Sequence, residues 1–189
     1  MALKLNVIVC STRPGRVGPS VARWFHEAAC RHGRFEAELV DLADFDLPIY
    51  DEPNHPRTRK YEHDHTRRWS ASVAAADAYA FVMPEYNFCP PPAFVNAANY
   101  VYHEWTYKPA GIVSYGGVSG GLRAAQGAKS LLTSLRVMPI PEGVPIPSVT
   151  QHLDDERRFV ANELHEASVK LMLDELVKWA EALKPIRKG

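Results

Sequence analysis

Short apolar runs alternate with amphipathic segments along most of this chain. The apolar runs are typical of buried β-strands, whereas apolar residues that recur every three or four positions are typical of α-helices. The sequence predicts strands at residues 5–10, 35–42, 78–83, 110–115 and 137–140. It predicts helices at residues 17–31, 65–76, 91–107 and 120–135, and a long amphipathic helix or pair of helices at 153–183. Gly33 is expected to end the first helix, because glycine readily takes the left-handed backbone conformation found there.

Five strands that alternate with helices predict an α/β fold. We expect one parallel sheet covered by helices on both faces, with right-handed crossover connections. No internal repeat or interdomain linker is visible, so residues 1–189 are predicted to form a single domain. In such sheets, ligands bind beyond the carboxyl ends of the strands. The loops after the first, third and fourth strands are therefore expected to carry the functional residues.

The composition narrows the choice of partners. The chain has 22 Lys and Arg residues and 22 Asp and Glu residues, so its formal net charge is zero. A protein that binds nucleic acid or a membrane surface usually carries a basic excess or patch, so neither partner is expected. Three cysteines without Cys-x-x-Cys spacing argue against a disulfide framework or a zinc site. Because no signal peptide or membrane-spanning stretch is visible either, the sequence predicts a cytoplasmic protein.

The loop after the first predicted strand, CSTRPGRVGPS (residues 10–20), favours an anion. It offers hydroxyl groups, two arginines (Arg13 and Arg16) and the N-terminus of a helix, where exposed backbone N–H groups bind phosphates. An ordinary turn with surface arginines is the alternative. The loop matches neither the Walker A pattern nor the Gly-x-Gly-x-x-Gly dinucleotide fingerprint. We therefore interpret it as a phosphate-binding loop of another type.

The loops after the fourth and third predicted strands suit a flat ligand. The fourth strand leads into SYGGVSGG (residues 114–121), whose glycines let the backbone approach a ligand closely, although a flexible turn is the alternative. The third strand ends in PEYN (residues 84–87), and prolines at 90–92 stiffen the chain that follows. A ligand with a phosphate tail and a flat heteroaromatic head suits all three loops. The sequence therefore predicts flavin mononucleotide (FMN).

The same segments resemble the NADPH-dependent FMN reductase family, whose members have a flavodoxin-like fold. The resemblance covers about residues 5–140 and is carried, in the family's order, by STRPGR (11–16), ADA (76–78), PEYN (84–87), Asn96-Ala97, Glu104-Trp105, Lys108-Pro109 and VSYGG (113–117). It implies a flavodoxin-like, five-stranded parallel sheet of order 2-1-3-4-5. It also implies bound FMN, NADPH or NADH as co-substrate, and a homodimer or homotetramer with flavin sites near the subunit interface.

The resemblance also assigns roles to residues of the three loops. It implies that the FMN phosphate is bound by Ser11 and Arg13, with backbone help around Val17 and Gly18. It implies that the isoalloxazine ring is lined near N5 and C4=O by Pro84, Glu85, Tyr86 and Asn87, and near N1 and C2=O by Ser114, Gly116 and Gly117. We name no catalytic side chain, because the hydride chemistry belongs to the flavin.

Some positions leave questions open. Phe88-Cys89 stands where the family more commonly has Gly-Ser, and Val95 where it often has lysine, so the resemblance leaves the acceptor preference undetermined. The basic and histidine-rich segment 55–68 either contacts the NADPH phosphates or forms a solvated face. Its histidines lack further well-spaced ligands, so no metal site is expected.

The predicted function is that of an FMN-dependent NAD(P)H oxidoreductase. It would pass hydride from NAD(P)H through bound FMN to a small-molecule acceptor, such as free flavin or a quinone, by a ping-pong mechanism. The alternative is a flavodoxin-type electron carrier without NADPH-reductase activity. Such carriers are usually strongly acidic, and this chain is neutral, which favours the enzyme. A regulatory or scaffold protein that has lost flavin is the third alternative.

Overall fold

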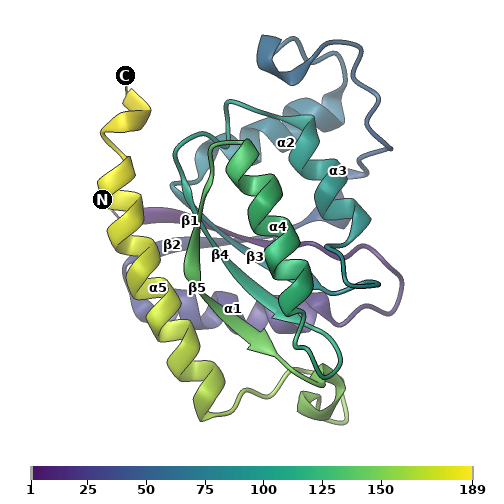
Figure 1. The fold of residues 1–189 in the computed structure, drawn as a ribbon, viewed down its shortest axis with the longest axis vertical. Helices are drawn as coiled ribbons and strands as arrows, with labels where there is room; N and C mark the ends of the chain where they lie inside the picture. Colours follow the sequence, from purple (N-terminus) through teal and green to yellow (C-terminus); the bar gives the residue numbers. More distant parts are fainter. Residues whose placement is uncertain (1, 189) are drawn as a thin grey trace.

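The computed structural model describes residues 2–188 and contains one five-stranded sheet (Figure 1). The strand order is β2-β1-β3-β4-β5, and every neighbouring pair is parallel. This order confirms the predicted flavodoxin-like arrangement. The strands are β1 (Leu3–Val9), β2 (Phe35–Asp41), β3 (Ala78–Pro84), β4 (Pro109–Tyr115) and β5 (Met138–Ile146).

Helices cover both faces of the sheet. One apolar cluster joins the sheet to α1 and α5, and a second cluster joins its other face to α2, α3 and α4 (Figure 1). The helices are α1 (Gly18–His32), α2 (Asp64–Ala75), α3 (Pro92–Tyr100), α4 (Leu122–Ser134) and α5 (Glu163–Leu183). Because β3 and β4 lie inside the sheet and are covered on both faces, all their residues are buried.

Local sequence signals set several helix ends. Gly33 ends α1 in the left-handed conformation, with φ of 76°, as predicted. Pro92 occupies the first turn of α3, where its missing N–H group costs no hydrogen bond. α5 begins with a capping box, in which Asn162 Oδ1 accepts from His165 N–H and His165 Nδ1 accepts from Asn162 N–H.

Two predicted helices were too long. α3 ends at Tyr100 rather than at 107, because Val101 is extended, with φ of −133° and ψ of 158°. The indole of Trp105 is nevertheless buried in the turns that follow. The helix predicted from residue 153 begins only at Glu163, and residues 153–159 form a tight hairpin instead.

The last strand is longer than predicted. β5 reaches Ile146 instead of residue 140, although three of its nine residues are prolines. Proline cannot donate to a neighbouring strand, so it is tolerated mainly at the edge of a sheet. β5 lies at the edge of this sheet, and only β4 pairs with it.

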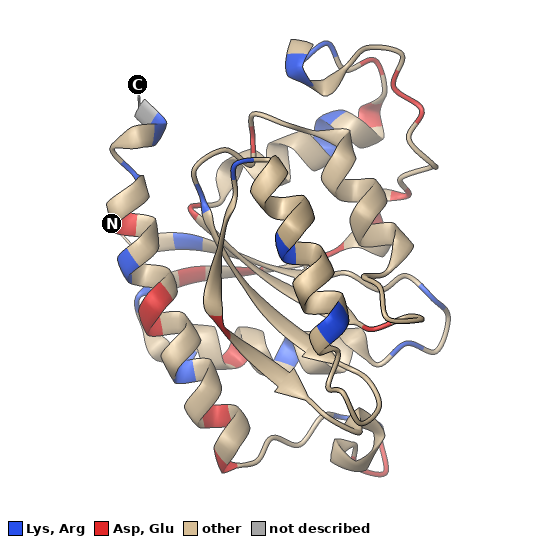
Figure 2. Ribbon diagram, viewed as in Figure 1, with Lys and Arg blue, Asp and Glu red and all other residues tan. Residues whose placement is uncertain are grey.

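Basic and acidic residues are interspersed over the ribbon (Figure 2). The helix α5, for example, carries both signs along its length. Within residues 2–188, no helix combines the length and the apolar character that crossing a membrane requires.

Candidate active site

The three predicted loops meet at the carboxyl edge of the sheet, where Tyr115 at the end of β4 joins them. Its backbone carbonyl accepts from Glu85 N–H at 3.0 Å. Its hydroxyl donates to Ser11 Oγ at 3.3 Å, which connects β4 to the β1–α1 loop. Burial raises the pKa of Tyr115 above its ordinary value of 10.0, so the hydroxyl keeps its proton at neutral pH. Sequence reasoning missed Tyr115, although a buried aromatic with a polar tip at the end of a strand is a usable signal.

The β1–α1 loop presents backbone N–H groups that other parts of the protein do not use. Arg16 N–H donates to Arg13 O at 3.3 Å. Within residues 2–188, several other N–H groups of the loop find no acceptor, among them those of Thr12, Arg13, Gly15, Val17 and Gly18. Free N–H groups at the N-terminus of a helix form an anion-binding site.

Gly18 keeps this loop closed against the end of the sheet. A Cβ atom at this position would lie 2.4 Å from Ser11 Oγ and 2.8 Å from the Tyr115 hydroxyl oxygen. Any larger residue would therefore push the loop away from β4. Ser11 itself is fully buried, so its side chain supports the loop from beneath.

The two arginines of this loop have different roles. Arg16 Nη1 and Nη2 donate to the two carboxylate oxygens of Asp41 at 2.7 and 2.8 Å, and both side chains are only 19% exposed. The hydrogen bond to Asp41 raises the pKa of Arg16, and Arg16 also donates to Ser11 O. Arg13 is exposed and forms no salt bridge within the described part of the chain. Arg13 is therefore the arginine of this loop that is free to bind an anion.

Residues 86–89 form a two-residue hairpin turn after β3. Tyr86 N–H donates to Cys89 O at 3.0 Å, and Cys89 N–H donates to Tyr86 O at 2.9 Å. The two central residues, Asn87 and Phe88, have φ of 50° and 67°. Asparagine tolerates this conformation, whereas phenylalanine rarely adopts it. The turn exposes Asn87 and Phe88 to solvent at the carboxyl edge, while Tyr86 is half-buried.

Glu85 uses its carboxylate to cap α4. Oε2 accepts from the backbone N–H groups of Arg123 at 3.0 Å and Ala124 at 3.4 Å, and Oε1 accepts from Ser119 Oγ at 3.1 Å. Arg123 Nε lies 3.2 Å from Oε1, and the Arg123 guanidinium lies 3.9 Å from the centroid of the Phe88 ring. The carboxylate therefore positions the loop, and because Glu85 N–H is bonded to Tyr115 O, only the backbone carbonyl of Glu85 is left to face a ligand. The preceding residue, Pro84, is buried at the end of β3.

The glycine-rich loop after β4 is partly used for internal contacts. Ser114 Oγ donates to Gly120 O at 2.8 Å, and Gly116 N–H points at Ile146 O at 3.4 Å. Gly117 is exposed, and a Cβ atom built on it meets nothing within 4 Å. Gly117 is thus the residue of this loop whose backbone a ligand can approach most directly.

The segment after β5 supports the glycine-rich loop from behind. Ser148 N–H donates to Gly117 O at 2.8 Å, and Val149 N–H donates to Gly116 O at 3.1 Å. Sequence reasoning missed this support because these are backbone hydrogen bonds, which no residue pattern indicates.

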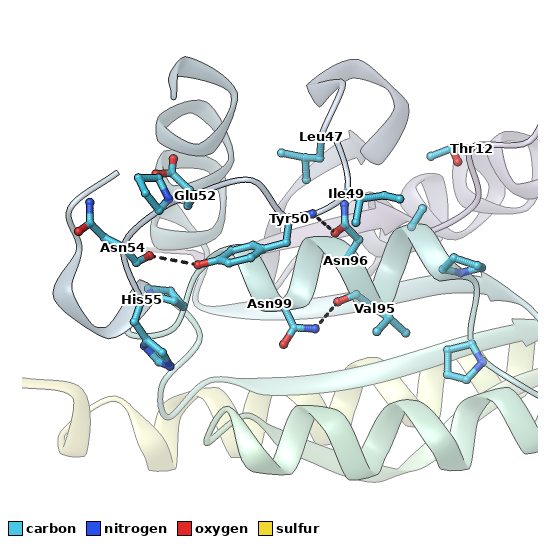
Figure 3. A pocket seen from close by; sticks show the side chains of 15 residues that line it. Thr12, Leu47, Ile49, Tyr50, Glu52, Asn54, His55, Val95, Asn96 and Asn99 are labelled. Atoms are coloured by element: carbon cyan, nitrogen blue, oxygen red, sulfur yellow. Dashed lines mark hydrogen bonds between the residues drawn. The ribbon is translucent and has the colours of Figure 1, made fainter. Parts of the chain in front are cut away.

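A cavity of about 1080 Å³ opens beside the loops that follow β1 and β3 (Figure 3). Residues 47–56 form one wall and α3 forms the other, and Thr12 and Pro90 also line the cavity. The Tyr50 ring lies over this cavity, and Tyr50 N–H donates to Asn96 Oδ1 at 3.0 Å, which holds the two walls together (Figure 3). Most of the lining is apolar, which suits a flat ring.

Comparison with known proteins decides the family. The model of the NADPH-dependent FMN reductases matches residues 3–151. The chain belongs to the NADPH-dependent FMN reductase family. An NAD(P)H-dependent FMN reductase of Schizosaccharomyces pombe is 38% identical over 172 residues, which span 82% of this chain and 86% of that protein. Another from Nectria sp. is 36% identical over 150 residues, or 76% of this chain and 75% of that protein.

Solved structures show the same fold. FerB, a flavoenzyme NAD(P)H:(acceptor) oxidoreductase from Paracoccus denitrificans, superposes with a TM-score of 0.76 at 21% identity, over 96% of this chain and 98% of that one. Membership of the family makes this protein an NAD(P)H oxidoreductase with FMN as its cofactor and NAD(P)H as its co-substrate.

The residues present fit FMN. The free N–H groups of the β1–α1 loop and the exposed Arg13 suit a phosphate. The open backbone at Gly117 suits the polar edge of a flat ring, and so do the N–H groups of Asn87 and Phe88, which have no acceptor within residues 2–188. The three groups of donors surround one edge of the sheet, where flavodoxin-like folds bind FMN.

The basic and histidine-rich segment 55–68 makes contacts within the protein. The Arg57 guanidinium lies 4.5 Å from the centroid of the Tyr102 ring, and His65 Nε2 lies 3.1 Å from Asp51 Oδ1. The basic residues Arg59, Lys60, Arg67 and Arg68 are exposed, so a contact of this segment with the NADPH phosphates stays a prediction, as does a solvated face. Among residues 2–188, no three His, Cys, Asp or Glu side chains are placed to hold a metal ion.

Proposed function

We propose that this protein passes hydride from NAD(P)H through bound FMN to a small acceptor, such as free flavin or a quinone, in a ping-pong reaction. The observation that carries the proposal is the junction of three donor-bearing loops through Tyr115 at one edge of the sheet. Bound FMN supplies the hydride chemistry, and the protein supplies binding and orientation.

The binding roles follow from which groups are free. Arg13 and the N–H groups of Val17 and Gly18 hold the phosphate, and Ser11 keeps their loop in place. The hairpin at Tyr86 and Asn87 faces the N5 side of the ring. Gly117 N–H faces its N1 side, where a fixed backbone donor stabilises negative charge without taking part in proton transfer.

Four of the predicted site residues support the site indirectly. Pro84 ends β3, and Glu85 fixes the following turn to α4. Ser114 closes the glycine-rich loop through Gly120 O, and Gly116 holds that loop to β5. Each therefore positions a neighbour that contacts the ring.

The cavity beside the loops is the proposed path for NAD(P)H and the acceptor. Two large apolar side chains stand at its edge, Ile49, which is 92% exposed, and Val95, which is 38% exposed. Exposed apolar residues beside a binding cavity are typical of an interface. We propose that a second copy of the chain packs here in a homodimer, or in a homotetramer built from such dimers, and that the protein acts in the cytoplasm without nucleic acid or membrane partners.

Anaerobic spectroscopy tests the reductase proposal. The purified protein, loaded with FMN, is mixed with NADPH or NADH and its visible absorbance is followed. Bleaching within seconds, followed by return of the colour on addition of a quinone or free flavin, is the expected result. Absorbance that persists with both nucleotides contradicts the proposal and favours the flavodoxin-type carrier. A protein that refuses FMN favours the scaffold alternative.

Two further measurements test the finer points. Initial rates at several NADPH and acceptor concentrations are expected to give parallel double-reciprocal lines, and intersecting lines contradict the ping-pong order. Light scattering coupled to size exclusion is expected to give twice or four times the chain mass. Ile49→Asp is expected to lower that mass, because a charge at the interface opposes assembly.

A further inference from the structure

One of the two arginines in the β1–α1 loop is already neutralised. Arg16 is held by Asp41 through two hydrogen bonds, and neither side chain is more than 19% exposed. A guanidinium engaged in this way has few donors left for a ligand. The loop itself therefore offers one free cation, Arg13, to a phosphate that carries nearly two negative charges at neutral pH.

A second free arginine reaches this loop from a distant part of the chain. We propose that Arg157 completes the phosphate site, together with Arg13, and binds a phosphate monoester. Arg157 Nη2 donates to Gly15 O at 3.3 Å, although 142 residues separate them in sequence. Gly15 is the exposed middle of the β1–α1 loop, and a Cβ atom on it would meet nothing within 4 Å. The inference rests on the proposed function, which puts the FMN phosphate at this loop.

Internal hydrogen bonds hold the hairpin that carries Arg157. Leu153 and Phe159 form an antiparallel bridge at its base. Asp154 Oδ1 accepts from the backbone N–H groups of Glu156 at 3.1 Å and Arg158 at 2.7 Å, which holds the turn. Arg157 itself has φ of 61°, in the left-handed region. The side chain therefore extends from a fixed backbone position.

The hairpin is also fixed to the start of α1. Phe159 N–H donates to the buried Ser20 Oγ at 2.7 Å, and the Phe159 ring packs on Trp24 with 4.9 Å between centroids. Ser20 lies in the first turn of α1, directly after the phosphate-binding loop. Arg157 is thus positioned before a ligand arrives, which lowers the entropic cost of binding.

The guanidinium of Arg157 forms no salt bridge with the acidic residues of its hairpin. Asp154 and Glu156 both pair with Arg158. Within residues 2–188, Arg157 forms no salt bridge, and the Gly15 carbonyl is the acceptor that its guanidinium contacts. A guanidinium fixed beside free N–H groups but lacking a carboxylate is suited to a phosphate oxygen, to which it forms strong charge-assisted hydrogen bonds.

Two phosphate monoesters reach this edge of the sheet in the proposed reaction: the 5′-phosphate of FMN and the 2′-phosphate of NADPH. The test compares Arg157→Ala and Arg157→Gln with Arg23→Ala, which removes an exposed arginine of α1 whose side chain forms no hydrogen bond or salt bridge within residues 2–188. Apoproteins are titrated with FMN and with riboflavin, and the FMN-loaded enzymes are assayed with NADPH and with NADH. Circular dichroism melts check that the variants fold.

The expected result is about tenfold weaker FMN binding by both Arg157 variants, with riboflavin binding unchanged, since one charge-assisted hydrogen bond has about this effect. Unchanged FMN binding with kcat/KM for NADPH falling about tenfold relative to NADH also supports the proposal and assigns the 2′-phosphate. An equal loss of affinity for FMN and for riboflavin overturns the proposal. The proposal also fails if the Arg157 variants behave like Arg23→Ala in both the binding and the activity assays. If the unsubstituted protein bound FMN no tighter than riboflavin, the phosphate loop assignment in the proposed function would itself fail.

Discussion

Replacing Glu85 distinguishes its observed role as a helix cap from its predicted role as a flavin contact. Its side chain is 9% exposed and accepts hydrogen bonds from the backbone and guanidinium of Arg123, from Ala124 N–H and from Ser119 Oγ. Loss of a helix cap costs about 1 kcal/mol, and loss of a negative charge at a helix N-terminus about 0.3–1 kcal/mol. The Ser119 bond contributes about 1 kcal/mol, and the half-exposed Arg123 pair contributes less than about 1 kcal/mol. Glu85→Ala is therefore expected to lower the free energy of unfolding by about 2–4 kcal/mol.

Urea unfolding of the apoprotein measures this loss directly, and Glu85→Gln is the matched variant. Glutamine keeps one acceptor oxygen and the shape of the side chain but loses the charge, so we expect about half of the loss. FMN affinity of Glu85→Gln is expected to stay within about threefold, since the carboxylate points at α4. If Glu85→Gln instead bound FMN more than about tenfold more weakly while its stability changed by less than about 0.5 kcal/mol, the carboxylate would contact the flavin and the capping argument would be wrong.

Two further predictions concern glycine and histidine. Gly117→Ala is expected to leave the urea midpoint nearly unchanged but to weaken FMN binding, because the added Cβ enters open space beside the ring. Gly121 has φ of 77°, and a Cβ on it would lie 2.8 Å from Tyr115 N. Gly121→Ala is therefore expected to lower the free energy of unfolding by about 2 kcal/mol or more. Equal stability losses in the two variants would contradict this contrast. Burial and the nearby His152 lower the pKa of His165 below 6.5. As pH falls below about 6.5, the unfolded chain therefore takes up a proton that the folded protein resists, and stability declines. His165→Gln is expected to reduce the difference between unfolding free energies at pH 7.5 and 5.5, and an unchanged difference would refute it.

The positions of the main elements were predictable because the apolar pattern is strong there, whereas the sheet order was predicted from the family resemblance. β3 and β4 are buried on both faces, so their sequences are continuous apolar runs. Gly33 ends α1 because glycine readily takes the left-handed conformation. The end of α3 was not predictable in this way. Trp105 is buried from a turn at a spacing that also fits a helix, so periodicity alone extended α3 past Val101.

The hairpin at 153–159 was missed for a different reason. Its charged sequence is compatible with an amphipathic helix, but the Asp154 carboxylate accepts from backbone N–H groups that a helix would have used. Asp154 is held in its charged form by these hydrogen bonds and by Arg158, which lower its pKa. A competition between side-chain and main-chain acceptors is decided by tertiary contacts, here the bond from Phe159 N–H to Ser20 Oγ.

The sequence predicted which loops form the candidate site, but not which atoms of those loops are free to bind a ligand. The three loops do meet, but the side chains of Glu85 and Ser114 are used within the protein. Residue type shows which groups a loop contains, whereas the contacts show which of them remain free. Arg16 illustrates the difference, since only the fold shows that Asp41 neutralises it.

The support that residues 147–159 give to both the glycine-rich loop and the phosphate loop has a consequence for the order of synthesis. Both loops are complete by residue 121, but the backbone bonds from Ser148 and Val149 and the contacts of the 153–159 hairpin come from later in the chain. A ribosome releases the chain from its N-terminus, at about 5–20 residues per second. FMN therefore meets a finished site only after residue 159 has left the ribosome, well after both loops themselves have emerged.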